Sequence, residues 1–177
     1  SNTNVELYGY ALTQCGAQAG TLGVNVTDLN TAIGLMANAG VKGSKAGMSL
    51  KNMLANMAAP TDKMEAALKK LGMTADETGS YLKTTADGNV DLAATCKTLM
   101  SAMNGMEKSQ KVALLTAIVG KNAAPGILAM LSQGESAWNE LSDSIENSTS
   151  TVQFWNENMS IMGKKGNEAR KIIDSFK

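Results

Sequence analysis

The sequence contains no histidine. This absence removes the commonest general base of enzymes, the Ser-His-Asp and Cys-His catalytic arrangements, and most zinc sites. There are only two cysteines, Cys15 and Cys96, and both lie inside helical apolar patterns. Two thiols without histidine cannot complete a structural zinc site, so we interpret them as buried thiols of a protein from a reducing compartment. The sequence therefore predicts no catalytic residue, no metal and no cofactor.

Charge and aromatic residues are also scarce. Charged residues make up 18% of the chain, and 16 basic residues balance 16 acidic ones, so there is no net charge. A neutral chain has no long-range field to hold phosphate backbones, which argues against specific nucleic-acid binding. No apolar run reaches the roughly 18 residues that a membrane-spanning helix needs. With 4% aromatic residues and 12 methionines, the core must be mainly aliphatic, and most of the methionines are expected to fill gaps in it.

Apolar residues recur in steps of three and four along most of the chain, the pattern of helices with one buried face. The stripe over residues 27–39 is the most regular, and its members are Leu29, Ala32, Ile33, Met36 and Ala37. We predict an all-α fold, a bundle of about 8–9 helices with short loops. Residues 1–177 are interpreted as one helical segment of a longer protein, with a sub-boundary near 147–151 and with Ser1 and Asn2 as a tag remnant.

Several local signals set the expected ends and faces of these helices. Thr27, Ser44 and Thr61 are predicted to cap the helices that follow them. Residues 107–119 are expected to bury the stripe Val112, Leu115 and Val119, with Gly120 ending the helix. Residues 76–90 are the least helical stretch, and the Asp87-Gly88 turn suggests either an irregular loop or a small hairpin near 79–90.

The C-terminal stretch predicts one long helix over residues 151–176. Its apolar face carries Val152, Trp155, Met159 and Met162, although Gly163 weakens the middle. A continuous helix of this length would be a rod of about 37 Å. Part of it is therefore expected to project from a compact domain or to meet a partner.

A glycine-rich corner in residues 37–54 is the centre of the chain's organisation. Gly40 is placed to end one helix, because only glycine enters the left-handed region without a steric penalty. Gly43 loosens the corner, and Gly47 lies inside the next helix, where it costs about 1 kcal/mol relative to alanine. A second backbone packed against Gly47 would offset that cost. The corner lacks the spacing of a phosphate-binding loop and follows a helix rather than a strand, so nucleotide binding is not expected.

Acidic residues gather around the irregular stretch, at Asp76, Glu77, Asp87 and Asp91. A glycosidase needs two carboxylates across a cleft, ordinarily with aromatic residues that stack on the sugar. Only Tyr81 lies nearby. We therefore interpret these residues as turn formers and helix caps.

The same corner resembles the core signature of tail tape measure proteins from long-tailed phages. The family pattern is roughly Ala-Gly-Ile-Lys-Gly-Ser-x-Ala-Gly-Thr-x-Leu-Arg-Asn-Met-Leu. Met48 stands where the family usually has threonine, and Lys51 where it has arginine. Looser similarity continues at Pro60, at Leu71-Gly72-Met73, at Asp87-Gly88 and at Ile118-Val119-Gly120. The matching residues of the corner are Gly40, Lys42, Gly43, Ser44, Ala46, Gly47, Leu50, Asn52, Met53 and Leu54.

The resemblance implies a structural protein of the virion tail that sets tail length, templates assembly of the tail tube and leaves at DNA ejection. The partners it implies are other copies of itself, the tail tube protein, a tail assembly chaperone and tip or baseplate proteins. It implies a location in the host cytoplasm during assembly and a transient membrane contact at ejection. The alternative is a helical protein-interaction or membrane-active module without catalysis. The candidate packing or interaction corner comprises Gly40, Lys42, Gly43, Ser44, Gly47, Leu50, Met53 and Leu54.

Overall fold

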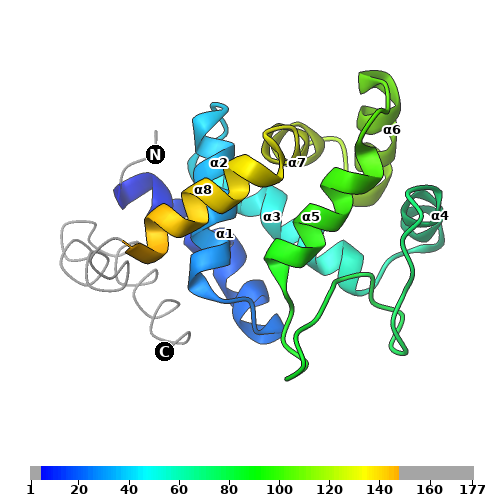
Figure 1. Ribbon diagram of the computed structural model, residues 1–177, viewed down its shortest axis with the longest axis horizontal. Coiled ribbons are helices and arrows are strands. Elements are labelled where there is room, and N and C mark those ends of the chain that lie inside the picture. Colours follow the sequence, from blue (N-terminus) through cyan, green and yellow to red (C-terminus); the bar gives the residue numbers. More distant parts are fainter. Residues whose placement is uncertain (1–4, 148–177) are drawn as a thin grey trace.

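A computed structural model describes residues 5–147, and this part of the chain is all-α (Figure 1). The prediction of an all-α multi-helix bundle is confirmed, and its loops are short except for the 21-residue connection 71–91 between α4 and α5. The predicted helix over residues 151–176 lies outside the described residues. Within residues 5–147, eight helices follow one another: α1 (Val5–Leu22), α2 (Val26–Asn38), α3 (Gly43–Ala58), α4 (Asp62–Lys70), α5 (Leu92–Met103), α6 (Lys108–Val119), α7 (Ala124–Leu131) and α8 (Gly134–Asn147).

Helix α3 is the centre of the bundle. It packs against α1, α2, α6 and α7, and its closest and longest contact is with α1. Its apolar face consists of Leu50, Met53, Leu54 and Met57, and all four are fully buried. Helices α4 and α6 pair at one end of the molecule, while α8 lies across α2 and α5 (Figure 1). The apolar face of α3 thus contributes to a core that it shares with four neighbouring helices.

Two of the three predicted helix caps are wrong. Asn25, not Thr27, caps α2, because its Oδ1 accepts a hydrogen bond from the Asp28 amide at 2.8 Å. Asparagine ranks above threonine at this position, so the helix begins earlier than the sequence analysis expected. Helix α3 begins at Gly43, and its cap is Lys42, which makes no side-chain capping bond. Ser44 therefore lies two residues beyond the cap position, inside the first turn of α3. Thr61 caps α4 as predicted.

Helix α6 is buried only in its second half. Leu115, Ile118 and Val119 are buried, but Val112, predicted to face the core, is 40% exposed. Its first residues lie beyond the reach of α3, so continuing the stripe back by one turn leads to the surface rather than to the core (Figure 1). The assignment of Val112 to the core was therefore wrong.

The hairpin suggested near 79–90 is reduced to a tight turn, in which the Thr85 amide donates to the Asn89 carbonyl and the Asp91 amide to the Lys83 carbonyl, both at 2.8 Å. The described residues contain one isolated antiparallel bridge, Thr84 with Val90, and no strand. The loop also bonds to the ends of helices: the Tyr81 amide donates to the Met57 carbonyl at 2.8 Å, and the Val90 amide to the Leu22 carbonyl at 2.9 Å. A two-stranded ribbon is marginal alone, whereas these bonds satisfy helix ends that would otherwise lack partners.

Two of the acidic residues around this loop, Asp76 and Asp91, form a turn and a helix cap, as predicted. Asp76 Oδ1 accepts from the Thr78 amide at 2.8 Å and from its hydroxyl at 2.6 Å. These bonds lower the pKa of Asp76. Asp91 caps α5 by accepting from the Ala94 amide at 2.9 Å.

A second carboxylate reaches the same helix end from α2. Asp28 is 8% exposed, and its Oδ2 accepts from the Ala93 amide at 3.1 Å. Burial raises the pKa of Asp28, and the nearby charge of Asp91 raises it further, while the bond to Ala93 and the charge of Lys97 lower it. Ionising Asp28 therefore costs more free energy in the folded state than in the unfolded chain.

We expect Asp28→Asn to raise the melting temperature at pH 7. A raised pKa means that the folded state binds the proton more tightly than the unfolded state, so the wild-type chain loses stability as pH rises through that pKa. Asparagine keeps an acceptor for Ala93 without the charge. The advantage should shrink as pH falls toward about 3.9, the usual aspartate pKa. Thermal unfolding of both chains between pH 3 and pH 8 measures this, and an advantage that grows in acid would contradict it.

Asp28→Ala is the matched control. It removes the acceptor as well as the charge and takes this partner from the amide of the half-buried Ala93. We expect it to lower the free energy of unfolding by about 1 kcal/mol.

Candidate functional site

The glycine corner begins with a turn that only glycine suits. Gly40 has φ +90°, and its amide donates to the Ala37 carbonyl at 3.0 Å. The next amide, that of Val41, donates back to the Met36 carbonyl at 2.9 Å. These two bonds form the Schellman motif, which satisfies carbonyls at the end of α2 and requires a left-handed residue between them. Gly40 therefore ends the helix as the sequence predicted.

Gly47 lies where two helix backbones touch. A Cβ atom at this position would overlap the carbonyl oxygen of Ala11 in α1 and come within 2.8 Å of the Ala11 Cα. The second backbone that the sequence analysis expected against Gly47 is therefore that of α1. This contact explains a glycine in the interior of α3 despite its unfavourable helix propensity.

The residues of the corner divide between surface and core. Gly40 and Ser44 are exposed, and Lys42 is half-buried. The buried members are Gly43, Gly47, Leu50, Met53 and Leu54. Only the outer part of the corner is thus accessible to another molecule, and its contact with a partner stays a prediction.

Two asparagines of α3 hold the end of α6, a role that sequence reasoning missed. Asn56 Nδ2 donates to the Ile118 carbonyl at 2.9 Å, and Asn52 Nδ2 donates to the Val119 carbonyl at 3.3 Å. The last carbonyls of a helix have no partner within the helix, so these amides satisfy groups that would otherwise be unpaired. The contact joins two separate parts of the motif resemblance, the corner and the Ile118-Val119-Gly120 step. The four-residue spacing of the asparagines is the signal that could have indicated a shared face.

We expect Asn56→Ala to lower the free energy of unfolding by about 1 kcal/mol, the usual net worth of such a bond. Asn139→Ala is the matched control, because Asn139 is exposed on α8. There the better helix propensity of alanine should raise stability by a few tenths of a kcal/mol. Urea unfolding of the two variants compares these effects, and equal changes would contradict the role of Asn56.

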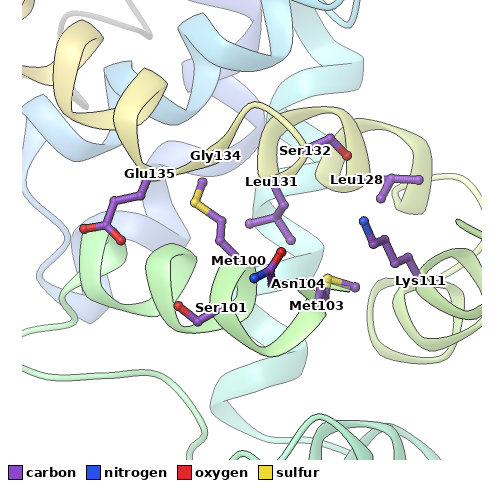
Figure 2. A pocket seen from close by; sticks show the side chains of 10 residues that line it. All are labelled: Met100, Ser101, Met103, Asn104, Lys111, Leu128, Leu131, Ser132, Gly134 and Glu135. Carbon is purple, nitrogen blue, oxygen red and sulfur yellow. The ribbon is translucent and has the colours of Figure 1, made fainter. Parts of the chain in front are cut away.

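A hollow of about 360 Å³ lies among the ends of α5, α7 and α8 (Figure 2). Its lining mixes methionines and leucines with scattered polar groups, and Figure 2 shows Glu135 and Lys111 at opposite ends. The polar groups therefore do not converge on one point, as they would in a site built for a small ligand. Over residues 5–147, no group of three or more cysteine, aspartate or glutamate side chains could hold a metal ion.

A second hollow, of about 520 Å³, runs between α6 and α7, and we call it the α6–α7 groove. Its apolar wall contains the exposed Val112 together with Leu128 and Pro125. Two lysines, Lys108 and Lys121, also line it. The complete lining is Lys108, Val112, Thr116, Lys121, Ala124, Pro125, Leu128, Ala129 and Ser132.

The two cysteines are free and buried, as predicted. Burial raises the pKa of Cys15 to about 12 and also raises the pKa of Cys96. A reactive thiol needs a lowered pKa and access to solvent, and neither cysteine has them. Among the described helices, none is both long enough and apolar enough to cross a membrane.

Comparison with known proteins gives two similarities. A family model described as phage-related minor tail protein matches residues 1–120. The tape measure protein of Pneumococcus phage Dp-1 is 28% identical over 142 residues, which are 80% of this chain and 12% of that protein. The chain thus spans about an eighth of the length of that relative. No solved structure matches.

Proposed function

Since this chain belongs to the phage-related minor tail protein family, we propose that it is a structural segment of a tape measure protein, which sets the length of the tail and templates its tube. The similarity to a tape measure protein over 80% of the chain supports the proposal. The resemblance of the glycine corner to the tape measure signature, drawn from residues 37–54 alone, agrees with it. The segment would act in the virion tail, after assembly in the host cytoplasm.

The observation that carries the proposal is that the family-matched part of the chain is organised by packing contacts. Residues 1–120 contain the close approach of Gly47 to Ala11 and the bonds from Asn52 and Asn56 to α6. These contacts position helices against helices and arrange no reactive groups. We assign the segment no catalytic step, which the lack of histidine and the buried, high-pKa thiols support.

The proposal includes contacts with other tail components. We expect these to be further copies of the protein along the tail, the tube protein, an assembly chaperone and the tip or baseplate. We also expect the protein to leave the tube when DNA is ejected. A transient membrane contact at that stage stays a prediction.

In-frame deletion of residues 5–147 from the full-length protein of the phage tests the proposal, with tail length measured by electron microscopy. A segment that counts length as a continuous helix would shorten the tail by about 215 Å, at 1.5 Å per residue. A segment that stays compact would shorten it by roughly 40 Å, the diameter of a domain of this size. Normal tails of unchanged length would contradict a role in setting length.

Replacement of the same residues by an unrelated helical segment of equal length is the control. It should restore the tail length if the segment acts by its extent. Loss of tails in both variants would indicate instead that this segment is required for assembly to start.

A further inference from the structure

We propose that the α6–α7 groove binds an amphipathic helix of another protein, one that carries carboxylates on both sides of an apolar seam. The inference goes beyond the proposed role in setting tail length, because it rests on this surface alone. Its evidence is the shape and polarity of the groove, the charge of its rim and the poor fit of the chain's own segments.

The groove has the form of a helix-binding site. Two helices form its walls, and its lining is mainly apolar, with Val112, Leu128 and Pro125 facing the hollow. Over residues 5–147, Val112 is the one large hydrophobic residue that is exposed, with 40% of its surface accessible to water. Amphipathic helices bind by laying an apolar face into such a groove. An apolar seam of a partner would remove Val112 from water.

The rim of the groove is positive and uncompensated. Lys108 and Lys121 line the groove, and Lys121 also lines an adjoining hollow with Lys45 and Ser44. No acidic residue lines either hollow. Within residues 5–147, the ion pair of the structure joins Lys69 to Glu65 on α4. Lys108 and Lys121 therefore form no ion pair with these residues. The complementary partner therefore presents carboxylates, which would steer it to this face.

The adjoining hollow connects the groove with the glycine corner. Ser44 is an exposed residue of the corner, and Met48, one turn further along α3, lines the same hollow. Pro125 is shared by both hollows. One continuous surface thus runs from Val112 to Ser44, and a bound helix along it would contact the accessible side of the corner.

The chain's own segments fit this surface less well. Helix α8 carries Glu135, Glu140, Asp143 and Glu146, but its Trp138 is already buried in the core. A second copy would therefore offer the charge of α8 without an apolar seam. Residues 148–162 carry apolar side chains but a single carboxylate, Glu157, so they cannot place carboxylates on both sides of an apolar seam. Residues 163–177 contain five lysines and arginines against one glutamate and one aspartate, so the positive rim would repel them.

Binding of designed peptides to the 177-residue chain tests the proposal. The probes are three 18-residue helical peptides: one with a leucine seam flanked by glutamates, one with the same seam flanked by lysines, and one with glutamates and a shuffled seam. By fluorescence anisotropy, we expect the first to bind at least about tenfold more tightly than the others, and more weakly as salt rises. Equal affinities for the glutamate and lysine peptides would overturn the proposal.

Variants of the chain locate the site. Lys108→Glu with Lys121→Glu should reverse the preference toward the lysine peptide, and Val112→Asp should weaken binding of the glutamate peptide at least about tenfold. The matched control is Lys63→Glu with Lys70→Glu, the same charge change at exposed positions of α4, which should leave the preference unchanged. An equal effect of both pairs would overturn the assignment to the groove.

Two further outcomes would give the groove to a different occupant and so overturn the proposal. The first is a dimer of the 177-residue chain that Val112→Asp dissociates, detected by sedimentation. The second is a cross-link within the monomer from Lys121 to residues 148–177, detected by mass spectrometry. A monomer without such a cross-link, together with selective binding of the glutamate peptide, supports the inference.

Discussion

Replacing Gly47 by alanine lowers the free energy of unfolding by about 3 kcal/mol, the upper part of the usual range for overpacking a well-packed site. Helix propensity alone predicts the opposite, a gain of about 1 kcal/mol. The new methyl group would overlap the Ala11 carbonyl, and a backbone cannot rotate away as a side chain can. Helices α1 and α3 would have to separate along their main contact. Urea unfolding of the 177-residue chain measures the change, and Gly47→Leu should cost more.

Gly126→Ala is the graded comparison for Gly47→Ala. A Cβ at Gly126 would lie 2.9 Å from Ser49 Oγ and 3.3 Å from Val41 Cγ1, both of them side-chain atoms. Side chains can shift, so we expect a loss below about 1.5 kcal/mol. Adding Ser49→Ala should recover part of it. An unchanged or raised melting temperature for Gly47→Ala would contradict the close approach of the two backbones.

Replacing Trp138 by alanine is the second change with a large expected effect. Trp138 is 1% exposed and heads the fully buried side chains by volume. It belongs to the core cluster and lies on α8, which packs on α2 and α5. Truncating a buried tryptophan costs about 3–5 kcal/mol, because apolar contacts are lost and a cavity remains. The melting temperature should fall by roughly 10 °C.

Trp138→Phe distinguishes the effect of a smaller aromatic ring from the effect of losing the ring altogether. Phenylalanine keeps an aromatic side chain that anchors α8. We therefore expect Trp138→Phe to lower the free energy of unfolding by no more than about half as much as Trp138→Ala. Hydrogen exchange should show whether α8 opens alone or together with α2. Helix α8 lies beyond the family-matched residues 1–120. A loss below about 1 kcal/mol for Trp138→Ala would mean that α8 contributes little to the core.

The prediction of buried faces succeeded where a helix is covered along its whole length. The stripe of Leu29, Ile33 and Met36 in α2 is buried as predicted, because several helices surround α2. It failed at Val112, whose place in the pattern is equivalent but whose surroundings are open. Periodicity identifies a face of a helix, but it does not show how far along that face the neighbours extend.

The helix caps show a related limit. Thr61 was identified correctly, while Asn25 was missed in favour of Thr27, two residues further along. Both residue types can accept a bond from a free amide at a helix start, so local sequence leaves the choice open within a few residues. In the structure, Asn25 has the extended backbone of a cap residue (φ −76°, ψ 157°) and Thr27 lies inside the helix.

The sequence by itself determined that the chain is helical, where most helices end, and that Gly47 needs a close neighbour. Those properties depend on residues within one or two turns of each other, and local chemistry therefore specifies them. Only the tertiary structure decided that Ala11 is this neighbour, that Asn52 and Asn56 hold the end of α6, and that Val112 faces water. These contacts join residues dozens of positions apart. Such pairings depend on how all the helices fill one core, which no single stretch of sequence encodes.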